Sequence, residues 1–200
     1  IIYRKIYMKN PLVIYWSPYV STFGGGNNML YQEPETLFKS LMDRKSDDVK
    51  DRTPWSYLSC PAASNRLKRT FVFRSPITAE YEFDFTDKEN PIVNPISQTY
   101  YEYSVNRRSV LKDSAIISFQ IKHLAFCEES VEALFHPPMM FRPGYMQYGT
   151  SIPGSFDISK WFRPHVFEVQ MWDQKGIFRI EEGEPLFCLE IPVNDRDIIL

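Results

Sequence analysis

Three histidines, His123, His136 and His165, are the side chains of this sequence best suited to hold a metal ion. Metal sites inside β-barrels often use two histidines one residue apart on a strand, so that both imidazoles face inward. This sequence has no such pair, so a metal site would have to gather all three histidines from separate strands. The alternative is that they are ordinary surface or core histidines. We expect no cofactor.

Asp157 is the strongest catalytic candidate. It follows Ile152-Pro153-Gly154-Ser155-Phe156, at the entrance to an expected strand. A carboxylate in this position commonly caps the turn, and a catalytic or ligand role is the alternative. The sequence contains no Gly-x-Ser-x-Gly elbow and no reactive cysteine environment, so nucleophilic catalysis is not indicated.

Trp161, Arg142 and Arg163 are the binding candidates. Each arginine lies beside a proline and is predicted to bond a loop carbonyl or a carboxylate. The tryptophans and several tyrosines also suggest a stacking platform for bases or sugars, although aromatic clusters in a domain this aromatic are more often core. The residues in question are Trp16, Trp55, Trp161, Trp172, Tyr100, Tyr101 and Tyr103.

Composition excludes several classes of protein. The net charge is −2, with both signs spread along the chain, which argues against a dedicated nucleic-acid binder. No apolar run approaches a membrane span, and no apolar segment follows Arg4, Lys5 and Lys9, so neither membrane insertion nor a signal peptide is expected. Three widely spaced cysteines indicate free thiols in a reducing compartment.

Apolar residues alternate with polar ones through most of the second half of the chain, as in half-buried strands. The alternating sets are Tyr81, Phe83, Phe85; Ile117, Phe119, Ile121; Val131, Ala133, Phe135; Phe167, Val169, Met171; and Phe178, Ile180. We predict a mostly β fold over residues 1–200 as a single domain, an antiparallel jelly-roll-like sandwich or barrel.

The remaining segments have weaker signals. Pro34 and Glu35, followed by apolar residues at helical spacing, predict one short helix near residues 34–42. The segment 55–63, with prolines at positions 54 and 61 and no period, predicts no regular element, and 86–99 predicts a loop. We expect a hairpin turn over 173–176 and a last strand over 186–191, after the turn at Gly183.

Five segments together resemble an uncharacterised family encoded by marine tailed phages of the cyanophage type, over nearly the full chain. They are Tyr15 to Val20, Glu33 to Glu35, Thr70 to Pro76, Ile152 to Gly154 with Asp157-Ile158 and Lys160 to Pro164, and Gly183 to Phe187. The family carries no known activity. The resemblance implies a phage-encoded protein that works in the cytoplasm of a bacterial host or is built into a virion.

A second, local resemblance is to the end of the barrel of trimeric dUTPases and dCTP deaminases. Gly154-Ser155-Phe156-Asp157, Trp161 and Gly183 to Leu189 follow the order and approximate spacing of motifs in those enzymes. It implies that Asp157 and Trp161 lie at a nucleoside pocket. The segments that bind phosphate and metal in those enzymes have no counterpart here.

The leading hypothesis is a non-enzymatic phage accessory or structural protein that binds protein partners or self-associates. A nucleotide-processing enzyme of the dUTPase or dCTP deaminase type is the first alternative, with Asp157 as base or sugar contact and Trp161 as stacking ring. A cupin-like metal protein using His123, His136 and His165 is the second.

Overall fold

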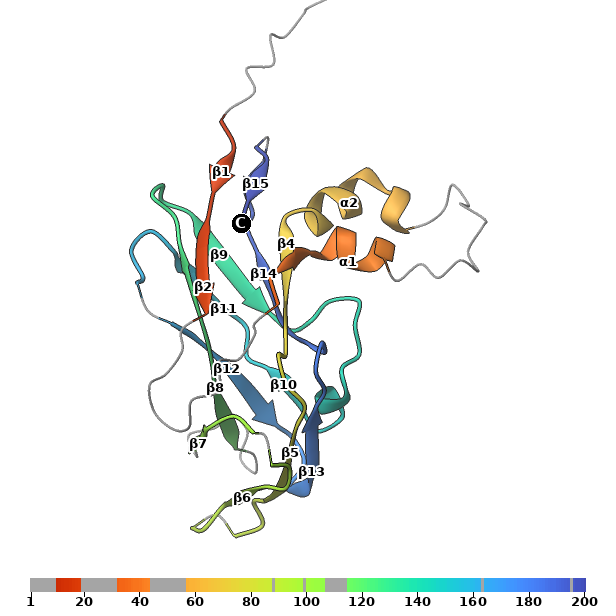
Figure 1. Ribbon diagram of the computed structural model, residues 1–200, viewed down its shortest axis with the longest axis vertical. Coiled ribbons are helices and arrows are strands. Elements are labelled where there is room, and N and C mark those ends of the chain that lie inside the picture. Colours follow the sequence, from red (N-terminus) through yellow and green to blue (C-terminus); the bar gives the residue numbers. More distant parts are fainter. Residues whose placement is uncertain are drawn as a thin grey trace, which may run out of the picture.

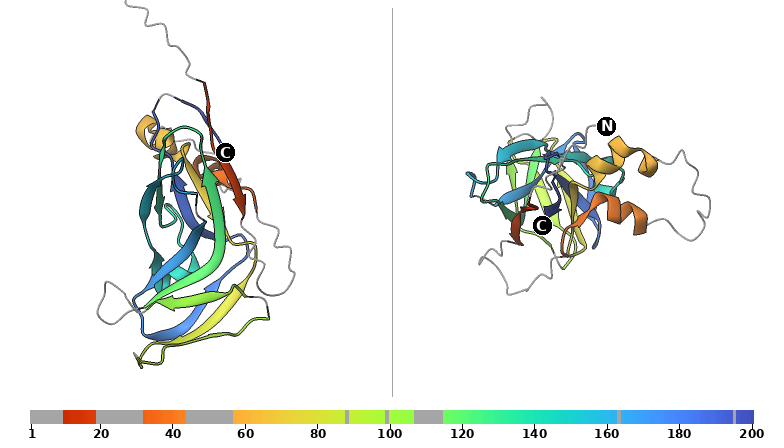
Figure 2. Two further views of the ribbon diagram at one scale, coloured as in Figure 1. Left: turned by 90° about the vertical axis from the view of Figure 1, so that its left-hand side faces the viewer. Right: turned by 90° about the horizontal axis from the view of Figure 1, so that it is seen from above.

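Two β layers pack face to face in the computed structural model, which confirms the prediction of a mostly β, antiparallel fold (Figure 1). The structure describes residues 10–18, 32–43, 57–87, 89–98, 100–106, 115–162, 164–194 and 196–200. Trp55 and Arg163 lie outside these ranges, so the predictions for them are not tested. Two short α-helices lie on one side of the layers (Figure 2).

The first layer is built around the long strand β8, in the order β10-β12-β8-β2, with β7 also paired to β8. The strands are β2 (Tyr15–Pro18), β7 (Tyr103–Asn106), β8 (Ile116–Phe126), β10 (Gly149–Ser151) and β12 (His165–Met171). All pairs are antiparallel. Ile117, Phe119 and Ile121 are fully buried, so the predicted alternation of β8 places one face of this sheet in the core.

The second layer has the order β11-β9-β14-β4-β3 and continues into a smaller sheet, β13-β5-β6. The strands are β3 (Glu35–Thr36), β4 (Thr70–Arg74), β5 (Ala79–Asp84), β6 (Ile92–Pro95), β9 (Glu132–His136), β11 (Gly154–Asp157), β13 (Lys175–Ile180) and β14 (Pro185–Glu190). Ser75 N donates to Glu184 O (2.9 Å) and Gly183 N to Ser75 O (2.8 Å), which carries the pairing across the bend. Gly183 has φ +76°, a conformation that favours glycine, and the predicted turn before β14 is confirmed.

One segment closes an edge of the sandwich. Strand β10 pairs with β12 in the first layer and β11 pairs with β9 in the second, while only Ile152 and Pro153 separate β10 from β11. Residues 149–157 therefore pass from one sheet to the other, and Asp157 stands at the end of this crossing.

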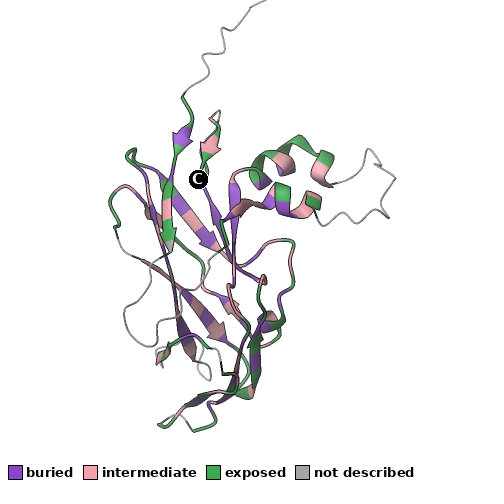
Figure 3. Cartoon of the chain, in the orientation of Figure 1, coloured by how far each residue is buried: buried purple, intermediate pink, exposed green. Residues whose placement is uncertain are grey.

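Aromatic rings from both layers fill the space between the sheets. Phe119 of β8 stacks on Phe178 of β13, with 5.3 Å between ring centroids, and lies 5.1 Å from the ring of Tyr81 of β5. The Tyr81 hydroxyl donates to the Tyr101 carbonyl (2.9 Å) and accepts from the Tyr101 N–H (2.7 Å), so its polar end is satisfied. Figure 3 shows buried residues along the strands and exposed residues mainly at turns and loops.

The helices cover the outer face of β4 and β14. They are α1 (Leu37–Asp43) and α2 (Pro61–Leu67), with short 3-10 turns at η1 (Tyr57–Ser59) and η2 (Gly144–Gln147). The predicted helix near 34–42 begins later than expected, because Thr36 Oγ1 accepts from Lys39 N (3.2 Å) and caps it while Glu35 pairs with β4. Helix α2 corrects the prediction of no regular element over 55–63: Pro61 occupies a first-turn position, where its missing N–H costs nothing.

Three strand predictions also need correction. The expected loop 86–99 contains β6, an edge strand, and an edge position tolerates Pro95 because no ladder donor is needed there. The turn 173–176 does not join hairpin partners: β12 pairs with β8 and β10, whereas β13 pairs with β5. Strand β14 is not the last, since β15 (Ile198–Ile199) pairs in parallel with β1 (Leu12–Val13).

Arg196 stabilises the parallel pair of β1 and β15. Its guanidinium donates to the carbonyls of Asn10 (2.8 Å) and Pro11 (3.3 Å) and to both carboxylate oxygens of Glu129 (2.6 and 2.7 Å). Leu12 N also donates to Asp197 O (2.8 Å). Residues 10–14 are therefore held extended beside the C-terminal segment and next to Glu129.

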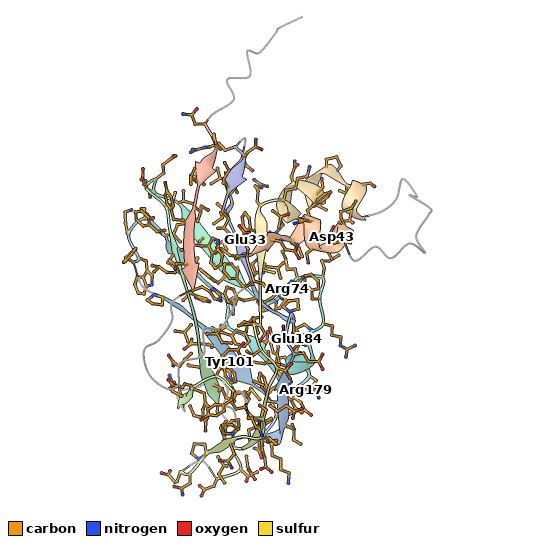
Figure 4. The ribbon with its side chains drawn as sticks, viewed as in Figure 1. Glu33, Asp43, Arg74, Tyr101, Arg179 and Glu184 are labelled. Carbon is orange, nitrogen blue, oxygen red and sulfur yellow. The ribbon has the colours of Figure 1, made fainter. Side chains whose placement is uncertain are left out.

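Arg74 joins helix α1 to the bend between the two parts of the second layer, near the middle of the body (Figure 4). It donates to the Gly183 carbonyl (2.8 Å) and to Ser40 Oγ of α1 (2.5 Å), and lies 5.4 Å from the centre of the Phe141 ring. These contacts assign Arg74 a structural role, because its guanidinium N–H groups bond a backbone carbonyl and a side chain of helix α1.

Candidate protein-binding surface

The structure brings two of the three histidines together and places the third elsewhere. His123 of β8 and His165 of β12 are direct cross-strand partners, and both contact the ring of Phe187 in the core. His136 lies on the opposite face of the second layer, where its Nε2 is 3.4 Å from a carboxylate oxygen of Glu190. Within the described part of the chain, no three His, Cys, Asp or Glu side chains form a group that could hold a metal ion.

Aromatic rings surround the histidine pair. His165 stacks on Phe135 at 3.7 Å between ring centres, and His123 lies 4.7 Å from Phe73. Burial lowers the pKa of His123 to about 3, with a further contribution from repulsion by His165, and burial lowers the pKa of His165 to about 4. Both imidazoles are therefore neutral at pH 7.

His136 lies next to the Arg66–Glu190 ion pair beneath helix α2. Glu190 accepts two hydrogen bonds from Arg66 Nε and one from Arg66 Nη2 (2.8 Å), a bidentate arrangement. Cys188, two residues before Glu190 and opposite His136, is fully buried. Burial raises the pKa of the Cys188 thiol to about 12, so it stays protonated and unreactive.

Asp157 closes the turn that follows β11. Its Oδ1 accepts from Ser159 N (3.0 Å) and Ser159 Oγ (2.6 Å), and its Oδ2 accepts from Ser130 Oγ (2.7 Å) and Lys160 Nζ (2.7 Å). The bonds from Lys160, then Ser130 and Ser159, hold the pKa of this carboxyl well below its usual range. The structure thus gives Asp157 the turn-capping role, and a ligand role for it stays a prediction.

Replacing Asp157 by alanine is expected to loosen the turn 157–160 and lower the melting temperature by a few degrees. Four bonds to the carboxylate are lost, and the donors of Ser159 and Lys160 no longer have this acceptor. Hydrogen exchange of the Ser159 and Trp161 amides should become faster. Asp157→Asn, which keeps one acceptor oxygen, should show a smaller change. Unaltered exchange in Asp157→Ala would contradict the capping role.

The other predicted binding residues do not gather around Asp157. Arg142 is exposed in the segment before η2, and Trp161 follows the Asp157 turn. Nor do the aromatic residues form one platform: Trp16 packs in the core against Phe73, and Tyr101 is buried.

A different aromatic group forms at the surface, which we call the aromatic surface: Tyr15, Phe126, Trp161 and Phe162. Phe126, at the end of β8, lies 6.5 Å from the Tyr15 ring of β2 and 5.9 Å from the Phe162 ring. Tyr15 is 55% exposed, Trp161 46% and Phe162 68%. Single exposed hydrophobics are ordinary, but neighbouring ones mark interaction sites.

The turn at Asp157 positions the two most C-terminal members of this surface. Trp161 N donates to Asp157 O (3.0 Å), and the Trp161 ring lies 6.0 Å from Phe156, which stacks on the buried Phe135. The surface is therefore supported by the core beneath it. Rigid aromatic side chains lose little entropy on binding, which suits them to contact a partner.

Acidic residues follow Phe126 closely in the sequence, and we call Glu128, Glu129 and Glu132 the acidic rim. All three are exposed, in or just after the loop that follows Phe126. Glu129 pairs with Arg196, whereas Glu128 and Glu132 make no ion pair within the described residues. Lys160, next to Trp161 in sequence, pairs with Asp157. Glu128 and Glu132 are therefore the rim carboxylates that remain for a cationic partner.

Sequence reasoning found Trp161 but missed Tyr15, Phe126 and Phe162. Phe162 directly follows Trp161 in a segment without periodicity, which was the one available signal. Tyr15 and Phe126 become neighbours only through the pairing of β2 with β8.

Comparison with known families, with curated proteins and with solved structures finds no match for this chain. Among the described helices, none combines the length and the apolar character needed to cross a membrane.

Proposed function

We propose that this chain is a non-enzymatic phage accessory or structural protein, with a jelly-roll-like domain that binds protein at the aromatic surface. The observation that carries the proposal is the grouping of exposed rings. Five aromatic side chains of the described residues are strongly exposed; of these, Tyr15 and Phe162 both contact Phe126, and Trp161 directly precedes Phe162. The phage assignment rests on the sequence resemblance alone.

The energetics favour a protein partner. An aromatic side chain buries about 150–250 Å² when it is fully covered. At about 25 cal/mol per Å², covering the exposed parts of three half-exposed rings contributes several kcal/mol, a large share of a typical protein–protein affinity. The Phe162 ring meets the plane of Phe126 at 80°, whereas Tyr15 and Phe126 lie at 28° to each other. A flat base would therefore not lie on Phe162 and on the other two rings at once.

The enzymatic alternatives receive less support. A nucleotide-processing site needs a carboxylate available to substrate, and both oxygens of Asp157 already accept hydrogen bonds. A cupin-like site needs converging histidines, and His136 is separated from the other two by the second layer. Nucleotide-dependent stabilisation that Asp157→Ala abolishes would favour the first alternative over our proposal.

Photo-crosslinking tests the proposed surface. A photoreactive phenylalanine at position 162 should give a discrete protein adduct in producing cells, because a partner covers that ring. The same group at Tyr100, which is 47% exposed on another part of the chain, is the matched control and should not. In a lysate of these cells, purified wild-type protein added before irradiation should compete the adduct away, and its Phe162→Ser variant should not. Equal labelling at both positions, or no adduct at position 162, would contradict the proposal.

A further inference from the structure

The acidic rim and the aromatic surface together indicate which kind of polypeptide segment could bind there. An apolar centre beside Glu128 and Glu132 fits a segment that carries aliphatic or aromatic side chains with interspersed cations and no acids. Such a segment occurs in this chain. Residues 1–9, which lie outside the described ranges, read Ile-Ile-Tyr-Arg-Lys-Ile-Tyr-Met-Lys: six apolar residues, three cations and no acid.

We propose that residues 1–9 of one copy bind the aromatic surface and acidic rim of a second copy. This rests on the proposed function and names its partner. Arg4, Lys5 and Lys9 meet the rim, and the apolar residues between them cover the rings. The N–H groups and carbonyls of an extended segment can also pair with the exposed side of an edge strand such as β2.

The attachment of the segment favours a second copy over its own. Arg196 holds the carbonyls of Asn10 and Pro11, and Leu12 N bonds to Asp197 O, so the chain is pinned in extended form up to residue 10. Its own Glu129 lies beside that pinned point, but covering its own Tyr15 as well would require residues 1–9 to reverse direction there. Nine extended residues span about 30 Å, which is enough to cross to a neighbouring copy without a reversal.

Charge exchange tests this contact in the full chain. One variant carries Arg4→Glu, Lys5→Glu and Lys9→Glu; a second carries Glu128→Lys and Glu132→Lys; a third carries all five changes. Sedimentation velocity over a hundredfold concentration range measures self-association. Each reversal alone should weaken association about tenfold or more, and the third variant should recover most of it, because opposite charges again face each other.

Glu102→Lys with Glu182→Lys is the matched control, since both residues are exposed and belong to other parts of the chain. It should leave association unchanged, and raising NaCl from about 50 mM to about 500 mM should weaken association of the wild type. Association that neither reversal alters, or a wild type that stays monomeric while folded, would overturn the inference. If Phe162→Ser lowers partner crosslinking or association while both reversals have no effect, the proposed function holds and only this inference fails.

Discussion

Replacing Phe187 by alanine is expected to lower the free energy of unfolding by about 3–5 kcal/mol, the usual cost of removing a buried aromatic ring. Phe187 is 2% exposed and belongs to β14. Its ring stacks on Phe73 at 4.7 Å and lies 4.9 Å from His165 and 5.7 Å from His123. It therefore fills the space between both layers, and its loss leaves a cavity that neither sheet can close alone.

Such a loss is a large part of the 5–15 kcal/mol that stabilises an ordinary domain. Urea denaturation of wild type and Phe187→Ala at pH 7 measures it. Phe187→Leu should cost less, and Ile177→Ala, at a side chain of β13 that is 54% exposed, should change stability by less than about 0.5 kcal/mol. A loss in Phe187→Ala no greater than in Ile177→Ala would contradict the described core.

Acidification from pH 7 to pH 4.5 is expected to lower stability by roughly 3–5 kcal/mol through His123 and His165. In the folded protein their pKa values are lowered to about 3 and about 4, against about 6.5 in the unfolded chain. Between pH 6.5 and 4, these imidazoles therefore bind protons in the unfolded chain that they do not bind in the folded protein. The stabilisation is fully present above pH 6.5 and is lost as the pH falls from 6.5 toward 4.

Urea denaturation at several pH values measures this dependence, and histidine variants assign it. His165→Phe places an aromatic ring against Phe135 without a titrating group, so it should remove about half of the slope between pH 6.5 and 4.5. His136→Gln, on the other face of the second layer, is the control. It should leave unchanged the pH dependence of stability that is due to His123 and His165. Asp157, whose pKa is lowered, contributes stability that is lost only below about pH 4, outside this window. A flat profile between pH 7 and 4.5 would contradict neutral imidazoles at His123 and His165.

The alternation of apolar and polar residues predicts the strands of this fold wherever one face of a strand is exposed to solvent. Tyr81, Phe83 and Phe85 alternate with acids, and the structure buries all three. The same reasoning missed β6, because Pro95 and Asn94 disfavour a strand interior but not an edge. It also misassigned the turn 173–176, since a turn signal does not reveal that β13 pairs with a strand about ninety residues earlier.

The site was less predictable than the fold. Asp157 was recognised as a turn cap or a ligand from its place after Gly154, and the cap is observed. The histidines were weighed as one group, but strand pairing divides them between the two faces of a sheet. The grouping of Phe126 with the exposed Phe162 has no local signature, because it depends on which strands end at the same place.

Covalent labelling of side chains by hydroxyl radicals, in producing cells and in dilute purified protein, tests the central claim most directly. If protein covers the aromatic surface, labelling of Trp161 and Phe162 relative to Tyr100 should fall several-fold in cells, because bound partner excludes the radicals. The same ratio in cells and in dilute solution would contradict a binding function for this surface.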